Sequence, residues 1–247
     1  FDVRAELGLA ASKNEVRSGG KPKETAKRYR HYTDLLANKD IDAVIVSTPD
    51  HWHSRVAIDA AKAGKHVYCE KGLTRTFNEA LDLYDTVKET GITFQLGHQN
   101  RQVEAYEQAK RIINQNLLGP INLVQLTTNR NSPGGAWVWG IHPEGNAKTI
   151  DWETFQEPSP NKIPFGDEAL RRFFRWRCWF DYGTGLSGDL FSHDFDQINQ
   201  IMGLGIPKYA SSSGGIYFYK DGRDVPDVWN ATLEYPDKDL TDSYSAT

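Results

Sequence analysis

The segment of residues 42–72 constrains the fold of this chain more than any other, because its hydrophobic pattern changes period twice. Residues 43–48 form a nearly continuous run of apolar and β-branched side chains without polar alternation. Such a run is typical of a parallel strand that helices cover on both faces. A stretch with helical spacing follows, and His66–Glu70 returns as a second strand. The segment therefore predicts a βαβ unit in a central parallel sheet.

Ser54 and Gly64 set the expected limits of the helix between these two strands. Serine is a preferred N-cap residue, and glycine suits the left-handed position just after a helix. His51 and His53 are then expected in the turn that leaves the first strand, with Glu70 at the end of the second. Because open α/β sheets hold their ligands beyond the carboxyl ends of the strands, both loops are expected to line one crevice.

These two loops carry motifs that resemble those of a known family. Residues 47–53 read Ser-Thr-Pro-x-x-x-His, and residues 70–72 read Glu-Lys-Gly. The pair, joined by one short helix, resembles the Gfo/Idh/MocA oxidoreductases, whose hallmark at the second position is Glu-Lys-Pro. Gly72 departs from that pattern: it keeps Lys71 but loses the fixed φ of proline, so the geometry of this loop stays open.

The resemblance implies a nicotinamide cofactor, NAD or NADP, and places its contacts in three loops that leave the parallel strands. The loop that begins at Gly97 resembles the family's loop that reaches the nicotinamide ribose. The residues expected to contact the cofactor are Ser47, Thr48, Pro49, Asp50, His53, Glu70, Gln99, Asn100 and Arg101.

We expect residues 1–120 to form a Rossmann-type dinucleotide-binding domain that is incomplete at its N-terminus. Residues 1–9 read like a helix that follows a second Rossmann strand, so the first strand and its glycine loop are expected to be missing. Thr76 and Glu79 predict a capping box for a later crossover helix, which Gly91 ends.

Residues 121–247 are expected to form an α+β domain with a largely antiparallel open sheet, incomplete at its C-terminus. Residues 121–128 alternate as an antiparallel strand would. Residues 215–219 and 227–235 predict two strands around a turn, and a further strand is expected at the end of the chain. Residues 131–182 form a long aromatic excursion, of a kind that is usually functional or disordered.

A second motif, Asp-x-x-x-His, lies more than a hundred residues downstream, at Asp189 and His193. On a helix expected over residues 189–202 these side chains can meet, and the family carries the same motif opposite its Glu-Lys loop. Oxidising a secondary alcohol requires a base and a group that stabilises the alkoxide. We therefore predict His193 as the base, Lys71 as the polarising or proton-sharing partner and Asp189 as the residue that orients His193. Lys71 and His193 could exchange roles.

Aromatic faces in residues 131–182 could pack against the C–H faces of a sugar, or could pack the segment onto its own domain. The candidate substrate contacts are Trp137, Trp176, Arg177 and Tyr182. Residues 183–188 match Gly-x-Gly-x-x-Gly, but they follow no clean strand. They predict a tight turn into a helix, and not the dinucleotide loop.

Composition excludes several other classes of function. The chain is 38% hydrophobic and 25% charged, with a net charge of -4 and no basic block, so neither nucleic acid nor a membrane surface is an expected partner. Cys69 and Cys178 are expected to be buried thiols. His51 and His53 alternate as metal ligands can, but no carboxylate or cysteine set accompanies them, so no metal site is predicted.

Three functions stay open from the sequence. The first is an NAD(P)-dependent oxidoreductase that acts on a hydroxyl or keto group of a sugar, sugar derivative or cyclitol. The second is NAD-assisted glycoside cleavage through a transient keto sugar. The third is an inactive sugar- or nucleotide-binding module, in which Gly72 would mark a decayed loop. A homo-oligomer through the second-domain sheet is also expected.

Overall fold

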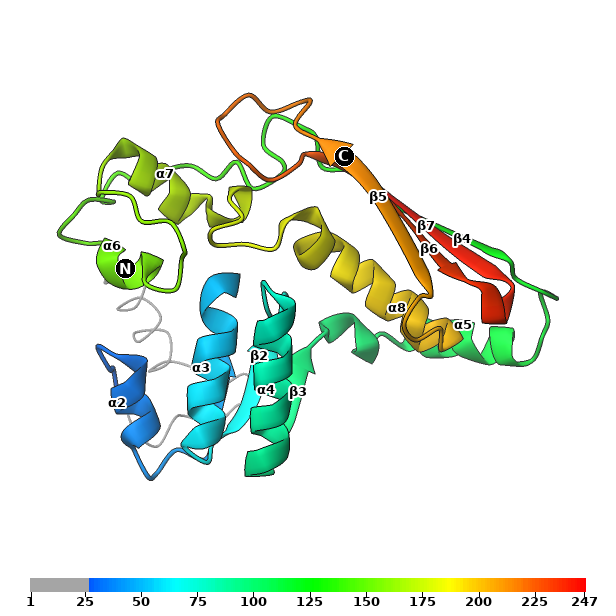
Figure 1. The fold of residues 1–247 in the computed structure, drawn as a ribbon, viewed down its shortest axis with the longest axis horizontal. Coiled ribbons are helices and arrows are strands. Elements are labelled where there is room, and N and C mark those ends of the chain that lie inside the picture. The colour runs from blue at the N-terminus through cyan, green and yellow to red at the C-terminus, as the bar shows by residue number, and fades with distance from the viewer. Residues whose placement is uncertain (1–26) are drawn as a thin grey trace, which may run out of the picture.

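The structure is a computed structural model that describes residues 27–247. Its strands form two separate sheets, a three-stranded sheet in the order β1-β2-β3 and a four-stranded sheet in the order β4-β7-β6-β5. The two sheets lie apart, with helix α8 (Ser192–Met202) between them (Figure 1). The predicted combination of a Rossmann-type sheet with an α+β domain is confirmed. The helix predicted over residues 1–9 lies outside the described residues.

The first sheet is parallel throughout, as its apolar strands predict. It consists of β1 (Ala43–Val46), β2 (His66–Glu70) and β3 (Phe94–Gly97). The register pairs the last residue of β1 with the fourth residue of β2, and the last residue of β2 with the last residue of β3. All three strands therefore end at one edge of the sheet, where their loops meet.

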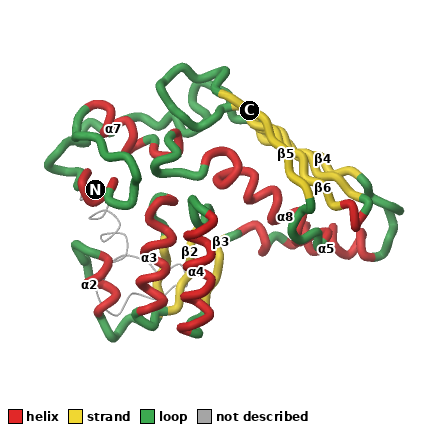
Figure 2. Tube along the Cα trace, viewed as in Figure 1, coloured by secondary structure: helices red, strands yellow, loops and turns green. Residues whose placement is uncertain are grey.

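Helices α2 (Tyr32–Ala37), α3 (Asp50–Lys62) and α4 (Phe77–Thr90) accompany this sheet. Helices α3 and α4 pack side by side (Figure 2). The capping box of Thr76 and Glu79 is present, and Gly91 ends α4 with a φ of 66°. Both predictions for α4 are confirmed, because its two ends carry local sequence signals.

The start of α3 differs from the prediction. The helix begins at Asp50 with Pro49 as its N-cap, so Ser54 lies inside the helix and caps nothing. Pro49 already has the extended backbone of an N-cap residue, and a carboxylate in the first turn is favoured by the helix dipole. His51 and His53 consequently lie on the first turn of α3, where both are buried.

The second sheet is mixed. Strand β6 (Val228–Tyr235) pairs antiparallel with both β5 (Tyr209–Gly215) and β7 (Leu240–Ala246). Strand β4 (Leu123–Thr128) pairs with β7 in parallel, although its alternating side chains suggested an antiparallel strand. Alternation reports that one face of a strand is buried and carries no information about the direction of its neighbour.

The strand predicted over residues 215–219 is wrong, because β5 ends at Gly215. The buried carboxylate of Asp227 accepts hydrogen bonds from the backbone N–H groups of Tyr217, Phe218 and Tyr219. These contacts fold the connection around Asp227 instead of extending the hairpin. The strand at the end of the chain, β7, is confirmed.

Helix α8 (Ser192–Met202) packs with its apolar side chains against the second sheet, and α5 (Glu104–Asn114) lies beside it. The helix predicted over residues 189–202 does not begin at Asp189. A π-helical turn, η3 (Ser187–Phe191), precedes α8 and contains that residue. Such turns place extra backbone within a helix and are frequent at functional sites.

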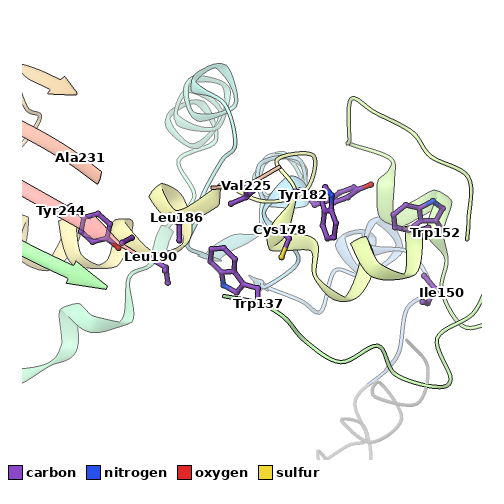
Figure 3. Packing of buried hydrophobic residues seen from close by; sticks show 13 residues of the cluster. Trp137, Ile150, Trp152, Cys178, Tyr182, Leu186, Leu190, Val225, Ala231 and Tyr244 are labelled. Atoms are coloured by element: carbon purple, nitrogen blue, oxygen red, sulfur yellow. The ribbon is translucent and has the colours of Figure 1, made fainter. Parts of the chain in front are cut away.

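The aromatic segment of residues 131–182 folds onto its own domain. It contains α6 (Trp152–Gln156), α7 (Asp167–Phe174) and a short 3-10 turn, η2 (Trp176–Cys178). Figure 3 shows several of its side chains within one hydrophobic cluster. Trp137 and Tyr182 are 4% and 0% exposed. This burial contradicts a substrate contact for either side chain and supports the alternative that they pack the segment in place.

Cys69 and Cys178 are free, buried thiols, as predicted. Burial raises the pKa of Cys69 to about 12 and that of Cys178 to about 11, so neither is a thiolate near neutral pH. Two short 3-10 turns, η1 (Gln99–Gln102) and η4 (Pro236–Lys238), complete the described elements. No helix within residues 27–247 is long and apolar enough to cross a membrane.

Candidate active site

Lys71 connects the two parts of the molecule. It follows β2 at the carboxyl edge of the parallel sheet, and its Nζ donates to Oδ1 of Asp189 at 2.5 Å and to the main-chain oxygen of the same residue at 2.7 Å. Both side chains are largely buried, with 14% and 7% of their surface exposed. The structure therefore brings together two predicted site residues that lie 118 positions apart in the sequence.

Arg177 adds a second positive charge to Asp189. Its Nε donates to Oδ1 at 3.2 Å, and its guanidinium lies 4.1 Å from the centroid of the Trp176 ring. Burial alone would raise the pKa of the Asp189 carboxyl, but the charges of Lys71 and Arg177 lower it below its usual range. Asp189 is thus held as a carboxylate by two cations, and of the predicted substrate contacts Trp176 and Arg177 lie beside this pair.

His193 lies one turn further along, on α8. Its Nδ1 is buried and has no hydrogen-bond partner in the part of the chain that the structure describes. The prediction that Asp189 orients His193 is therefore contradicted, because the carboxylate is engaged by Lys71 and Arg177 instead. A charge-assisted bond to an ammonium is stronger than one to a neutral imidazole, which explains the preference.

His98, the residue that follows β3, lies opposite His193. The two rings lie edge to face with their centroids 6.2 Å apart, and Nδ1 of His98 is also buried with no hydrogen-bond partner within residues 27–247. Burial lowers the pKa of both imidazoles, and the charge of Lys71 lowers that of His193 further. Both rings are therefore neutral near pH 7, the form in which one ring nitrogen can accept a proton.

Sequence reasoning missed His98 as a site residue, although it immediately precedes the predicted loop of residues 99–101. Its place directly after a parallel strand was the available signal.

Arg101 is predicted to contact the cofactor, but in the structure its side chain is bound to another residue of the chain. Its guanidinium binds both carboxylate oxygens of Asp196 on α8, with Nε at 2.8 and 2.9 Å from them.

The remaining predicted cofactor residues lie where the three loops meet. Asp50 and His53 are buried on α3, and the ring nitrogens of His53 lie 2.8 Å from the oxygen of Gly72 and 2.6 Å from that of Thr48. Glu70 and Asn100 are half-buried. The exposed members of the predicted set at this edge are Ser47, Thr48 and Gln99, with Pro49 partly covered.

This edge has the groups that the nicotinamide end of NAD requires. The side chains of Glu70, Gln99 and Asn100 form no hydrogen bond with another residue in 27–247, so they are available to ribose hydroxyls or a carboxamide. A cavity of about 970 Å³ runs along β1 and reaches Thr48 and Pro49. The donor and acceptor set therefore fits the cofactor at this end. No group of three or more His, Cys, Asp or Glu side chains in the described chain is placed to hold a metal ion.

A parallel sheet with polar loops at its carboxyl edge and a charged contact to a second domain defines a Rossmann-type nucleotide-binding protein. Residues 9–98 match the GFO_IDH_MocA family, described as an oxidoreductase family with an NAD-binding Rossmann fold. The predicted resemblance to this family is therefore confirmed over these residues, and the nicotinamide cofactor class is confirmed with it.

Curated relatives include dehydrogenases of sugars and cyclitols. Levoglucosan dehydrogenase of Pseudarthrobacter phenanthrenivorans is 29% identical over 184 residues, which is 74% of this chain and 41% of the relative. The scyllo-inositol 2-dehydrogenase (NAD(+)) of Bacillus subtilis is 36% identical over 106 residues, 42% of this chain and 31% of the relative. The chain therefore spans less than half the length of these two relatives.

Solved structures show the same fold. A levoglucosan dehydrogenase in complex with NADH and levoglucosan has a TM-score of 0.64 at 24% identity, covering 89% of this chain and 51% of that one. The WlbA dehydrogenase of Bordetella pertussis in complex with NADH and UDP-GlcNAcA has a TM-score of 0.64 at 20% identity, covering 88% and 56%. At these identities the likeness establishes the arrangement of the elements.

Proposed function

We propose that this chain carries the catalytic crevice of an NAD(P)-dependent oxidoreductase that interconverts a hydroxyl and a keto group on a sugar, sugar derivative or cyclitol. The observation that carries the proposal is the Lys71–Asp189 contact next to the unpartnered Nδ1 of His193, at the carboxyl edge of a parallel sheet. The sugar and cyclitol dehydrogenases among the relatives agree with this class of substrate.

The chain's own residues divide the proton chemistry between them. In the oxidation, His193 takes the hydroxyl proton, since its neutral imidazole can accept it. The ammonium of Lys71 stabilises the negative charge that develops on the substrate oxygen, and Asp189 holds that ammonium in place. Bound NAD would supply the acceptor for the hydride that leaves carbon. Glu70, Gln99 and Asn100 would hold its nicotinamide end.

Two observations bear on the other functions that the sequence left open. The tryptophan-rich segment of residues 131–182 favoured glycoside cleavage, but Trp137, Trp152 and Trp179 are buried in the core of the second domain, so these three side chains give that reaction no support. An inactive binding module would need no base, yet the ammonium of Lys71 acts on the imidazole of His193 and lowers its pKa. Gly72 also packs closely against Thr184 and Asp50, so the absence of a side chain there has a structural reason other than decay.

The test is an assay of the purified full chain with NAD and with NADP against sugars and cyclitols that include levoglucosan and scyllo-inositol. The appearance of the reduced cofactor in step with a keto product is the expected result. Release of an aglycone without net reduced cofactor would favour glycoside cleavage. Binding of a sugar without turnover of any member of the panel would favour the inactive module.

We also propose that the domain boundary lies near residue 120 and that the second sheet forms a homo-oligomer contact. Among the described residues no helix lies on the side of this sheet away from α8 and α5 (Figure 1), and six of the seven residues of β5 are exposed. Light scattering on the purified chain tests this, with a mass above 27.9 kDa as the expected result and a monomer as the contrary one.

A further inference from the structure

Gly72 occupies a position where a side chain has no room. A Cβ atom built there would lie 2.8 Å from Oγ1 of Thr184 and 3.3 Å from Oδ2 of Asp50. The backbone of Gly72 does not adopt a positive φ, so conformation does not demand glycine. The requirement is space, and the atoms that take that space belong to the second domain and to α3.

Those same two side chains are bonded to each other. Oγ1 of Thr184 donates to Oδ2 of Asp50 at 2.7 Å, and the Asp50 side chain is buried. Asp50 begins α3, just after β1, while Thr184 lies in the segment that leads into η3. The hydrogen bond therefore joins the first domain to the second. The two side chains that form it are also the ones nearest to a Cβ atom built at Gly72.

His53 holds the other side of the same loop. Its two ring nitrogens lie within hydrogen-bond distance of the main-chain oxygens of Gly72 and Thr48, so the ring contacts both the loop after β1 and the loop after β2. Gly72 is thus contacted on one side by the buried imidazole and on the other by Thr184 and Asp50. These contacts hold the backbone of Gly72 and so limit the movement of the neighbouring Lys71.

Thr184 and Asp189 are five positions apart, on the segment that includes η3. That segment consequently makes two separate contacts with the Lys71 loop. Thr184 packs on the backbone of Gly72, and Asp189 binds the ammonium of Lys71. The distance between the lysine and the start of α8, which carries His193, depends on both contacts.

We propose that Thr184 and Asp50 are positioning residues for Lys71, and that Gly72 lets the Thr184 hydroxyl reach Asp50. The proposal rests on the oxidoreductase function proposed for this site. A proline after the lysine would restrict the loop through its own ring; here a hydrogen bond between the domains restricts it instead. The position of Lys71 then depends on contact between the second domain, which carries Thr184, and the first, which carries Asp50.

The first experiment removes the hydroxyl without changing the volume of the side chain. Thr184→Val is expected to lower kcat by about 10- to 100-fold, since a small displacement of a catalytic group has an effect of that order. KM for NAD should stay unchanged, because the side chain of Thr184 binds Asp50 and none of Glu70, Gln99 and Asn100, which are proposed to hold the nicotinamide end. Thr184→Ser keeps the hydroxyl and is expected to retain kcat. A kcat for Thr184→Val equal to that of the unsubstituted chain would overturn the proposal.

The second experiment tests whether Gly72 and Thr184 act together. Gly72→Ala should lower kcat because the new methyl group displaces Thr184. In a Thr184→Ala background the Cβ no longer meets Oγ1 or Cγ2, so the same substitution should have a smaller effect. Independent effects, in which the two losses simply multiply, would contradict the role of Gly72.

A readout that needs no substrate separates this proposal from the proposed function. The rate at which an amine-reactive reagent modifies Lys71 is measured across pH by peptide mass spectrometry. Thr184→Val should increase this rate and leave that of Lys65 unchanged, because Lys65 is held by the main-chain oxygens of Asn38 and Ile41. If the unsubstituted chain turns over no sugar, the proposed function fails while the labelling still decides the positioning role. Equal labelling of Lys71 in both proteins would refute that role.

Discussion

Nζ of Lys71 lies 2.5 Å from Oδ1 of Asp189, so a lysine of the parallel-sheet domain is paired with a carboxylate in the π-helical turn that precedes α8, the helix that carries His193. The pair is largely buried, and a buried carboxylate without a cation is costly. The contact therefore has two consequences that experiments can separate: it places an ammonium in the crevice, and it holds the two domains together.

Lys71→Met removes the charge while it keeps most of the side-chain volume. We expect kcat to fall by about 100- to 10,000-fold, since the ammonium takes part in the proton chemistry. The free energy of unfolding should fall by only about 1–3 kcal/mol, because Arg177 still neutralises Asp189. Steady-state kinetics and urea unfolding measure the two quantities.

Lys65→Met is the matched control for this lysine. Lys65 is also buried, but it lies just before β2, at the edge of the sheet opposite Lys71, where it donates to two main-chain oxygens. It should lose stability without a loss of kcat per folded molecule. Comparable kinetic losses in both variants would show that Lys71 acts through folding alone.

The pH dependence of the reaction should report the neighbourhood of His193. Burial lowers the pKa of its imidazole, and the charges of Lys71 and His98 lower it further. A base with a lowered pKa stays neutral to lower pH, so the acidic limb of kcat/KM should lie below the usual histidine range. His98→Gln removes the positive charge that His98 acquires when it is protonated on the acidic side, so it should move that limb to higher pH. An unchanged limb would mean that His193 is not the group that titrates.

Arg101 was predicted from the sequence to contact the cofactor, whereas the structure binds its guanidinium to Asp196. If this pair only joins the loop after β3 to α8, Arg101→Gln and Asp196→Asn should each reduce stability by about 0.5–1 kcal/mol and leave the Kd for NAD unchanged. If Arg101 also holds the cofactor, Arg101→Gln alone should weaken NAD binding. Calorimetric titration of both variants distinguishes the two outcomes.

Local signals made most of the parallel-sheet domain predictable. The apolar run of β1 requires cover on both faces, and the Thr76 capping box with Gly91 marks both ends of α4 without reference to the rest of the fold. The start of α3 was misplaced because Pro49 and Asp50 form an N-terminus as good as Ser54 would, and only packing decides between them.

The second domain was less predictable, because long-range contacts determine it. The carboxylate of Asp227 folds the connection after β5 by accepting hydrogen bonds from three backbone N–H groups. No local sequence pattern predicts these bonds. The partner predicted for Asp189 was wrong for a similar reason. Helical spacing points to His193, whereas the observed partner, Lys71, lies more than a hundred residues away in the sequence. Helical spacing shows that Asp189 and His193 could be in contact, but the positive charges of Lys71 and Arg177 determine which side chains bind the carboxylate.

Asp242 provides a prediction about stability. This residue of β7 is 1% exposed, and neither carboxylate oxygen has a hydrogen-bond partner among the described residues. The buried hydroxyl of Tyr235 also has no hydrogen-bond partner within residues 27–247, and the charge of Asp194 acts on Asp242 from α8. Burial, followed by this charge, raises the pKa of Asp242 to about 6.

The folded state therefore holds the Asp242 proton more tightly than the unfolded state, in which the pKa is about 4. The free energy of unfolding should fall as pH rises from about 4 to about 6 and should lose nothing further from this group above that range. Asp242→Asn removes the charge, and at pH 7 it should stabilise the protein by about 1–3 kcal/mol. Urea unfolding at pH 4.5 and pH 7 measures the effect. The exposed Asp237→Asn serves as the control and should change little at either pH. A less stable Asp242→Asn protein at pH 7 would mean that the carboxylate has a favourable partner in solution.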